Sequence, residues 1–413
     1  MNSDNLISKL EMYCEENRSV REDLESSLTY AKSNAEQHLN STLFSALKWP
    51  ANLYEYTLYL TEYARWAPDQ TDNPAWTDPE TGTQQEVYDR LCHFYWLINQ
   101  KLDSSGRTMQ SNPDFSQWMV EYARCWGEFL NTEASFSQEQ LDNFRNNSPL
   151  YQVENSMIEV DGELRPNNPS GWKTFNQFFA RRLNPGLRPI TSPTTNTVIT
   201  CPADCTYRAQ YKIGPQSEVF SSEQNNTDIT LKKTHSFGNI TDLLAGSPYA
   251  DMFANGTFVH YFLAPYSYHH FHCPVAGELK ECRAVHGKVY MNVVIDQDKH
   301  SATQGQFDAP DNSTDGYEFA QARGIVVIDT STSPYGDIGL VAVVPVGMAQ
   351  VSSVQMVAVP GTQMQKGEEF GYFMFGGSDI IVLYQEGAQP DIYTGDQYRH
   401  VGTQIAQATK LAK

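Results

Sequence analysis

The sequence predicts an α+β protein in which an N-terminal helical domain precedes a mostly antiparallel, barrel-like β domain. Up to about residue 150, apolar and aromatic residues recur at helical spacing. From about residue 196, short β-rich runs alternate with clusters of Gly, Pro, Asn and Asp. Because 413 residues suffice for two ordinary domains, we place a helical accessory domain at residues 1–150 and a catalytic domain at residues 151–413.

Four segments of the N-terminal part have the spacing of amphipathic helices. Asn112 and Pro113 form an N-cap and first-turn pair, and the apolar residues that follow share one helical face as far as Leu130. The other three helices are expected at residues 3–38, 53–66 and 87–98, and residues 67–83 are expected to form a loop. Aromatic stripes at this spacing are typical of packed cores, so we expect no catalytic group here.

The remaining chain is predicted to contain a short helix, several strands and one long loop. Pro185 and Gly186 end a short amphipathic helix that begins near Phe175. Residues 296–317 form a polar insertion that we expect to be a surface loop. The predicted strands are residues 258–263, 324–328, 340–346, 351–359 and 380–384.

Composition excludes several classes of function. The net charge of −20 leaves no basic stripe for nucleic acid and disfavours an anionic membrane surface. No apolar run approaches the roughly 20 residues of a membrane-spanning helix, and the first residues lack a signal core. Seven cysteines without a Cys-x-x-Cys pair favour reduced thiols over disulfides or zinc. We therefore expect a soluble, cytoplasmic protein; the sequence does not indicate its oligomeric state.

A Gly-Gly-Ser corner near the C-terminus is the first candidate for chemistry. Gly376 and Gly377 permit backbone conformations that a Cβ would forbid, and an apolar strand follows Ser378. If a base activated Ser378, its hydroxyl could attack the carbonyl of Gly377. Most such corners are plain turns, so this interpretation depends on the rest of the chain.

Three histidines within four residues provide candidate bases. In an extended segment His270 and His272 share a face, whereas His269 points the other way. No carboxylate or cysteine stands at a familiar ligand spacing from them, so we predict no metal site. Histidine titrates near neutrality and suits a general base or acid. A histidine-rich surface strand is the alternative interpretation.

Asp204 provides a candidate carboxylate. It stands between Cys201 and Cys205 at the end of a strand, where an aspartate commonly serves turn chemistry. Alternatively it orients a histidine, as the third member of a triad does. Asp204, His272 and Ser378 would then form an acid–base–nucleophile set, since such triads occur in different chain orders on different folds.

Four segments resemble the phosphatidylserine decarboxylase family. They occur in the family's order and span most of residues 175 to 385. The helical N-terminal part is similar to an extra domain of a soluble branch that includes amino-acid decarboxylases of the tryptophan type. The segments are Phe178–Ile190 (FFARRLNPGLRPI), Pro202–Asp204 (PAD), Ala264–His272 (APYSYHHFH) and Gly371–Ser378 (GYFMFGGS).

The resemblance implies self-cleavage followed by decarboxylation. Asp204 would orient His272, which would take the proton from Ser378. Ser378 would attack the carbonyl of Gly377, and the chain would break between these two residues. A pyruvoyl group derived from Ser378 would remain as the only cofactor and serve as an electron sink for loss of carbon dioxide. The resemblance also assigns His269 to proton handling during decarboxylation.

The chain departs from the family at three places. Asp379 replaces a threonine or serine, and its carboxylate would stand beside the new carbonyl, slowing processing or changing substrate choice. Cys205 replaces a glycine, and Tyr266 with Ser267 replaces a more charged pair. None of these changes removes a member of the predicted triad.

The resemblance leaves the substrate open. The acidic charge and the helical domain favour a soluble L-amino acid, with aromatic ones first, over phosphatidylserine and its conversion to phosphatidylethanolamine. A different class also has to be considered. Residues 359–361 and 366–371 resemble the turns of a lipoyl or biotinyl carrier domain. Asp379 alone would favour an inactive binding homologue that is never processed.

Overall fold

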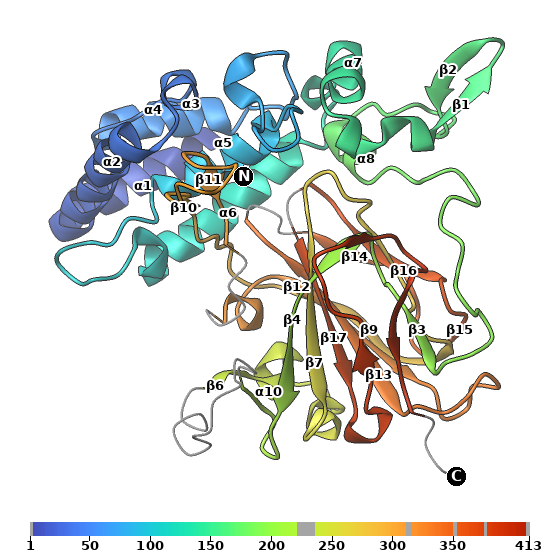
Figure 1. Ribbon diagram of the computed structural model, residues 1–413. Coiled ribbons are helices and arrows are strands. Elements are labelled where there is room, and N and C mark those ends of the chain that lie inside the picture. The colour runs from blue at the N-terminus through green and yellow to red at the C-terminus, as the bar shows by residue number, and fades with distance from the viewer. Residues whose placement is uncertain (1–2, 221–235, 311–315, 350–352, 376–377, 410–413) are drawn as a thin grey trace. The chain divides into compact units, whose positions relative to one another are not determined.

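The structure is a computed structural model that describes all residues except 1–2, 221–235, 311–315, 350–352, 376–377 and 410–413 (Figure 1). The chain forms two compact units. The first comprises Met1–Arg181 and Lys288–Pro310, and the second comprises Arg182–Gly287 and Asp311–Lys413. Helices dominate the early part and antiparallel strands the later part, which confirms the predicted α+β class.

Helices make up most of the first unit. The α-helices are α1 (Ser3–Glu16), α2 (Arg18–His38), α3 (Ser41–Ala46), α4 (Leu53–Tyr63), α5 (Glu86–Trp96), α6 (Pro113–Phe129), α7 (Gln138–Asn147) and α8 (Phe175–Phe179). Short 3₁₀ turns are η1 (Pro74–Trp76), η2 (Met109–Ser111), η3 (Glu133–Ser135), η4 (Pro149–Tyr151) and η5 (Val153–Ser156). One hairpin joins β1 (Met157–Val160) to β2 (Glu163–Pro166). Among the described residues, no helix has the length and apolar character to cross a membrane.

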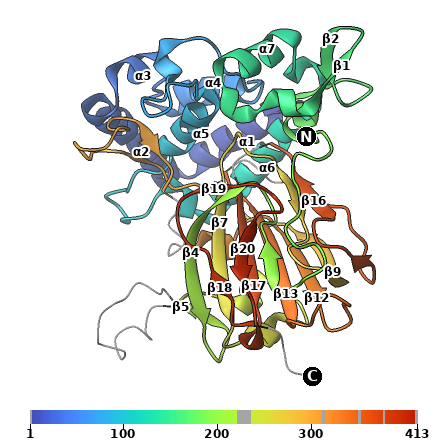
Figure 2. The same cartoon turned by 45° about the vertical axis from the view of Figure 1, so that its right-hand side comes forward.

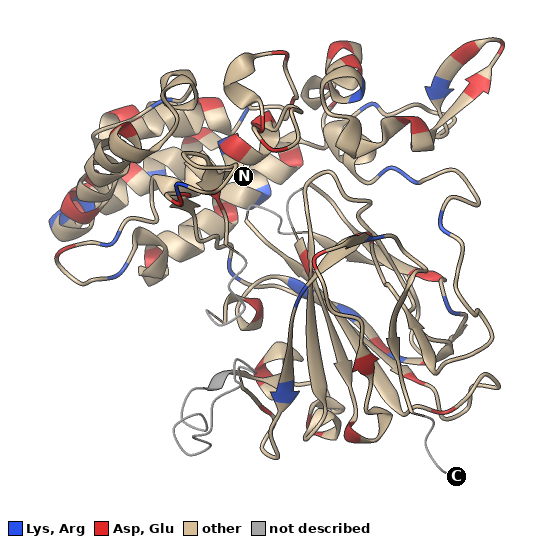
Figure 3. Ribbon diagram, viewed as in Figure 1, with Lys and Arg blue, Asp and Glu red and all other residues tan. Residues whose placement is uncertain are grey.

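The predicted helices are present, but one is divided in two and another is shorter than expected: the helix predicted to end at Pro185 ends at Phe179. The expected helix over residues 3–38 is interrupted at Asn17, between α1 and α2. The Asn112 side chain accepts hydrogen bonds from the amides of Asp114 and Phe115, which confirms the predicted N-cap of α6. Aromatic rings fill the space between helices: Trp66 and Trp126 stack with ring centroids 5.6 Å apart. Acidic residues are spread along these helices, with basic ones among them (Figure 3).

Residues 296–310 of the polar insertion belong to the first unit, and this segment is not simply a surface loop, as the sequence had predicted. Its strand β11 (Phe307–Asp308) forms a short antiparallel pair with β10 (Val294–Ile295), which directly precedes the insertion. The buried ring of Phe307 lies 6.0 Å from that of Trp96, measured between centroids. Burial of this apolar ring anchors the middle of the segment, which the polar residues around it did not indicate.

The second unit is built on a ten-stranded antiparallel sheet. Its order is β15-β9-β12-β13-β17-β7-β4-β5-β6, with β19 paired to β4. Figure 2 shows β4, β7, β17, β13, β12 and β9 side by side across this sheet. Its strands are β4 (Cys205–Ile213), β5 (Glu218–Phe220), β6 (Ser236–Asn239), β7 (Thr257–Leu263), β9 (Gly277–Val285), β12 (Arg323–Asp329), β13 (Leu340–Gly347), β15 (Gln363–Met364), β17 (Ser378–Tyr384) and β19 (Tyr398–Arg399).

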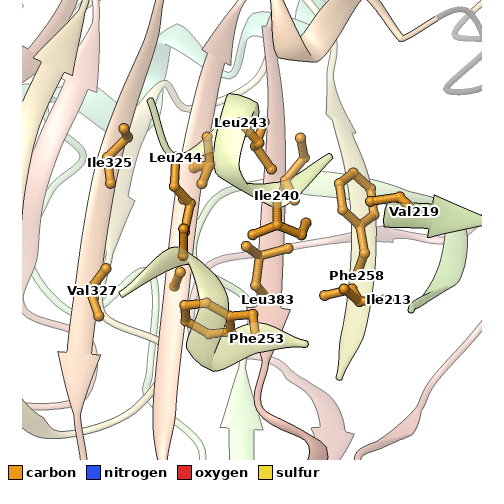
Figure 4. Packing of buried hydrophobic residues seen from close by; sticks show 14 of the residues in the cluster. Ile213, Val219, Ile240, Leu243, Leu244, Phe253, Phe258, Ile325, Val327 and Leu383 are labelled. Atoms are coloured by element: carbon orange, nitrogen blue, oxygen red, sulfur yellow. The ribbon is translucent and has the colours of Figure 1, made fainter. Parts of the chain in front are cut away.

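One face of the large sheet carries the main apolar core (Figure 4). Short helices α10 (Ile240–Leu243) and η6 (Ala250–Phe253) cover this face, and their side chains pack against Ile381 and Leu383 of β17. Side chains alternate between the two faces of a strand. Since Ile381 and Leu383 face the core, Asp379 faces the same side and Ser378 the opposite side.

Two smaller sheets and two short helical turns complete the second unit. The smaller sheets have the orders β14-β16-β8 and β18-β20-β3. In the first of them the ring of Phe271 lies 4.7 Å from that of Phe373. The predicted strand at residues 351–359 is shorter than expected: it is described only as β14, and residues 351–352 lie outside the described part. The bounds are β3 (Val198–Thr200), β8 (His270–His272), β14 (Val354–Met356), β16 (Glu369–Phe373), β18 (Asp391–Ile392), β20 (Gln404–Gln407), η8 (Tyr317–Phe319) and η9 (Glu386–Ala388).

Candidate active site

One end of the large sheet brings the sequence motifs together. β4 begins at Cys205, directly after the Pro202–Asp204 segment, and β17 begins at Ser378. The intervening strand β7 ends at Leu263, which pairs with Ser378. Neighbouring strands lie about 4.8 Å apart, so the starts of β4 and β17 are separated by about 10 Å. Motifs far apart in the chain therefore lie at the same end of the large sheet.

The histidine strand β8 is attached to both neighbouring motifs. The amide of His272 donates to the carbonyl of Pro202 at 2.7 Å. The amide of Phe373, which precedes Ser378 in the chain, donates to the carbonyl of His269 at 2.9 Å. Backbone hydrogen bonds thus connect β8 both to the segment before β4 and to the strand that leads toward β17.

The three histidines alternate as predicted. The rings of His270 and His272 both contact the ring of Tyr268, with centroid separations of 5.0 and 5.8 Å. The ring of His269 instead contacts Phe373, at 6.3 Å. His269 is buried, and its proposed part in decarboxylation stays a prediction.

His272 has the tautomer that a general base needs. Its Nδ1 lies 2.8 Å from the carbonyl oxygen of Gly367, which can only accept a hydrogen bond. Nδ1 therefore carries the proton and Nε2 carries the lone pair. Nε2 is buried and has no hydrogen-bond partner among the described residues. Burial lowers the pKa of His272, although the bond to Gly367 acts in the opposite direction, so the neutral form dominates at neutral pH.

Ser378 is buried at the start of β17. Its hydroxyl, like Nε2 of His272, has no hydrogen-bond partner in the described part of the chain. No described hydrogen bond joins the two groups, so proton transfer requires them to approach to about 3 Å. Gly377, the other side of the predicted cleavage point, lies outside the described residues. A buried, unsatisfied hydroxyl costs free energy and is the kind of feature that marks a reactive site.

Asp204 is held by partners that the sequence analysis did not predict. The guanidinium of Arg188 binds both carboxylate oxygens, with Nε 2.9 Å from Oδ1. Nδ1 of His400 lies 3.1 Å from Oδ2, and the amide of Val401 donates to Oδ1 at 2.8 Å. Burial alone would raise the pKa of Asp204, but the hydrogen bonds from His400 and Arg188 outweigh it and lower the pKa.

Asp204 therefore does not orient His272 through a direct hydrogen bond, contrary to the sequence interpretation. The side-chain hydrogen bond of His272 goes to Gly367, and the carboxylate oxygens of Asp204 are occupied. The charge of Asp204 still reaches His272 and favours its protonated form. The contribution of Asp204 to His272 is thus electrostatic, and its membership of a catalytic set stays a prediction.

Asp379 points away from Ser378. It lies on the core-facing side of β17, where the hydroxyl of Tyr317 donates to its Oδ2 at 2.9 Å. Nε2 of His260 lies 3.4 Å from its Oδ1, and all of these side chains are buried. Adjacent residues of a strand face opposite sides, so the sheet itself separates this carboxylate from the hydroxyl of Ser378. The Asp379 carboxylate therefore does not crowd the reactive position.

Glu369 forms a second group of ion pairs, separate from that of Asp204. Nδ1 of His270 lies 3.1 Å from the carboxylate of Glu369, which also pairs with Arg182 at 2.7 Å. The ring of His270 stacks between Tyr268 and Tyr372. These contacts give His270 a packing role, whereas Nε2 of His272 has no hydrogen-bond partner in the described part of the chain.

Sequence reasoning missed several residues of this site. Arg182 and Arg188 belong to the first motif, but their positions in the sequence did not reveal their acidic partners. His400 and Gly367 gave no signal at all, because their roles come from a side chain and a carbonyl brought near by folding. Pairing of β19 with β4 brings the segment around His400 to Asp204.

Comparison with known proteins gives the same family as the sequence motifs. A family model described as phosphatidylserine decarboxylase matches residues 175–407. Over 218 residues the chain is 33% identical to phosphatidylserine decarboxylase proenzyme 2 of Oryza sativa subsp. japonica, covering 52% of this chain and 30% of that protein.

The matches to two further relatives cover a larger share of those proteins. Decarboxylase iboD of Amanita muscaria is 26% identical over 308 residues, covering 70% of this chain and 82% of that protein. The phosphatidylserine decarboxylase proenzyme of Chlamydia trachomatis is 28% identical over 214 residues, covering 52% of this chain and 60% of the relative.

The pairing of Arg188 with Asp204 makes a prediction about stability. Replacing Arg188 by Met leaves a buried carboxylate without its main cation, which should cost about 3–5 kcal/mol of unfolding free energy. Arg18→Met is the control: Arg18 and its partner Glu22 are 89% and 61% exposed, so the loss should stay below about 1 kcal/mol. Chemical unfolding of both variants measures the difference.

The effect of Arg188→Met should depend on pH in a defined direction. Because the folded pKa of Asp204 is lowered, the ion pair stabilises the protein above the unfolded pKa of about 3.9 and loses this effect as pH falls through the folded value. The stability gap between wild type and variant should be largest near neutrality and should shrink in acid. A gap that stayed constant, or grew as pH fell, would show that Arg188 acts by packing alone.

Proposed function

We propose that this chain, which belongs to the phosphatidylserine decarboxylase family, is a proenzyme that cleaves itself at Ser378 and then acts as a decarboxylase. One observation carries the proposal: the Ser378 hydroxyl and the neutral Nε2 of His272 are buried in the same unit, and neither has a hydrogen-bond partner among the described residues. The strand of His272 is hydrogen-bonded to the segment that precedes β4, at the end of the large sheet where β17 begins. The chain spans only 30% of the rice relative's length, so the activity is proposed from the site itself.

The self-cleavage step follows from these two residues. Nε2 of His272 accepts the proton of the Ser378 hydroxyl, and the oxygen forms a bond to the Gly377 carbonyl carbon. The Gly377–Ser378 peptide bond breaks as an ester replaces it. Removal of the Cα proton of residue 378 forms the Cα=Cβ double bond of a dehydroalanine and expels the Gly377 carboxylate from Cβ. The dehydroalanine takes up a proton at Cβ to become an imine, and water hydrolyses the imine to a pyruvoyl group and ammonia.

The residues present fit a pyruvoyl group at position 378. The hydroxyl that would generate it makes no hydrogen bond to any described residue that the reaction would have to break. The carboxylate of Asp379 faces the other side of the sheet and accepts a hydrogen bond from Tyr317, so it does not contact a carbonyl at position 378. A bound pyruvoyl group supplies a carbonyl that can withdraw electrons from a substrate amine. To His269, which directly precedes β8, we assign the holding or return of a proton during decarboxylation.

Phosphatidylserine is the substrate that the relatives' names support most strongly, ahead of the aromatic amino acid that the sequence favoured. Its product would be phosphatidylethanolamine. A soluble amino acid is the second candidate. The observation in its favour is the match that extends over 70% of this chain to an Amanita protein whose name specifies a decarboxylase and no lipid. The net charge of −20, which an anionic lipid surface would repel, favours it too.

The carrier interpretation conflicts with the position of Lys366. A lipoyl or biotinyl lysine has to reach solvent, but Lys366 is buried and its Nζ donates to three backbone carbonyls. The side chain is therefore unable to carry a swinging group without unfolding its surroundings.

The lowered pKa of His272 predicts the pH profile of self-cleavage. The base form is present above the folded pKa, which lies below the ordinary value of about 6.5. The first-order cleavage rate should therefore stay on its plateau through that ordinary value and fall only at lower pH. Purified precursor, followed by denaturing gel from about pH 5 to 8, gives this profile. A fall centred above the ordinary value would contradict a neutral, buried base.

Substrate choice is tested on the cleaved protein. Carbon dioxide release from liposomal phosphatidylserine should exceed release from each free amino acid at matched concentration. His269→Ala is the informative variant, because it should still cleave but decarboxylate about 10²–10⁴-fold more slowly. Ser378→Ala should do neither. Faster turnover of a free amino acid would select the second candidate, and normal turnover by His269→Ala would remove His269 from the mechanism.

A further inference from the structure

Lys366 lies in the turn between β15 and β16, and the mechanism above leaves its buried cation without a role. Its Nζ donates to the carbonyls of Ser192, Thr195 and Val198 at 2.8, 2.5 and 2.6 Å. An ammonium has three hydrogens, so these acceptors use all of them. Burial lowers the pKa of Lys366 to about 8, and the cation still predominates at neutral pH. The side chain therefore anchors the turn to the loop that follows the first motif.

The same turn is fastened to the end of β8. The carbonyl of Gly367 accepts from Nδ1 of His272, and its amide donates to the carbonyl of Cys273 at 2.8 Å. The amide of Cys273 in turn donates to the carbonyl of Glu368 at 2.8 Å. Three hydrogen bonds thus link the turn to the residue pair that contains the proposed base.

Gly367 also packs against the first motif. Its φ of +83° lies in the region that favours glycine, and a Cβ there would approach Cδ1 of Ile190 to 2.4 Å. The position of the Gly367 carbonyl is therefore set from two sides: by close packing on Ile190 and by the Lys366 anchor on the neighbouring residue.

We propose that Lys366 is a positioning residue for self-cleavage: by holding its turn in place it fixes the Gly367 carbonyl, which keeps the proton of His272 on Nδ1 and the lone pair on Nε2. The inference rests on the proposed role of His272 as the base. A neutral imidazole has two tautomers, and only one presents Nε2 as an acceptor. In many triads a carboxylate makes this selection. Here the carboxylate of Asp204 is occupied by Arg188 and His400, and the carbonyl takes its place.

The test separates positioning from general stability. Lys366→Met removes the three donated hydrogen bonds at similar side-chain length. Arg323→Met is a matched control, because Arg323 is also a buried cation of the second unit that donates to three backbone carbonyls, those of Leu243, Gln321 and Asp242. Arg323 binds the segment that covers the opposite, core face of the sheet. Lys366→Gln is a milder second variant that retains part of the donor capacity.

Two readouts are used. Nitrogen-15 NMR of labelled histidine, in a Ser378→Ala background that cannot be cleaved at Ser378, reports the tautomer of His272, and His272→Gln identifies its signals. The rate of chain cleavage is measured in the protein that retains Ser378. Wild type should show the Nδ1–H tautomer. Lys366→Met should show a mixture of tautomers and cleave about tenfold more slowly or worse, since a positioned base contributes about 10²–10⁴-fold.

The outcomes distinguish the inference from the function on which it rests. Arg323→Met should keep the wild-type tautomer, and any loss of rate should be smaller than in Lys366→Met. If Lys366→Met does not fold, Lys366→Gln should show the same changes at reduced size. A wild-type tautomer and rate in Lys366→Gln or Lys366→Met would overturn the inference, as would equal effects of Lys366→Met and Arg323→Met. A protein that never cleaves, yet changes tautomer in Lys366→Met, would support the positioning role and contradict the proposed function.

Discussion

The register of β17 is the constraint on which the candidate site depends. This strand is paired on both sides, by β13 and β7, and its core-facing residues are fully buried. A shift of one residue would expose Ile381 and Leu383 to the wrong face of the sheet, which costs too much apolar burial to occur. The same register places Ser378 on one face and Asp379 on the other. Apolar packing far from the reaction thus decides which of two neighbouring polar side chains faces the site.

Charge balance around the site comes from the first motif. Arg188 pairs with Asp204, and Arg182 pairs with Glu369, so two acidic groups near the histidines are held as ion pairs. Buried carboxylates without such partners would become protonated or would raise the pKa of neighbouring histidines. With the acids paired, burial dominates at His272 and its pKa is lowered. The arginine-rich motif therefore supports a neutral base that lies many residues away in the chain.

Much of the fold could be predicted from the sequence, because the spacing of apolar residues that marks a helix or a strand involves residues close together in the chain. The N-cap at Asn112 and the apolar run after Ser378 are set by nearby residues, and both elements appear where expected. The alternation of His270 and His272 followed from strand geometry in the same way. Phe307 was missed because one apolar ring in a polar stretch carries no period. The partners of Asp204 were missed because the approach of His400 depends on strand pairing over almost 200 residues of chain.

Ser378 and His272 were identified as candidates, but their environment was not. Sequence could not show that a glycine carbonyl holds Nδ1, since every residue has a carbonyl and only the fold selects one. The sequence also could not show that Asp379 faces Tyr317. Which side of the sheet a residue faces depends on which residues of its strand pack into the core.

Intact mass of the purified protein under denaturing conditions tests the central claim most directly. Self-cleavage predicts two chains: residues 1–377, and a C-terminal fragment of residues 378–413 that is lighter by one ammonia than a fragment beginning with serine. Ser378→Ala and His272→Gln should remain single chains of 413 residues. A wild-type protein that releases carbon dioxide from its substrate while it remains one uncleaved chain would contradict the account.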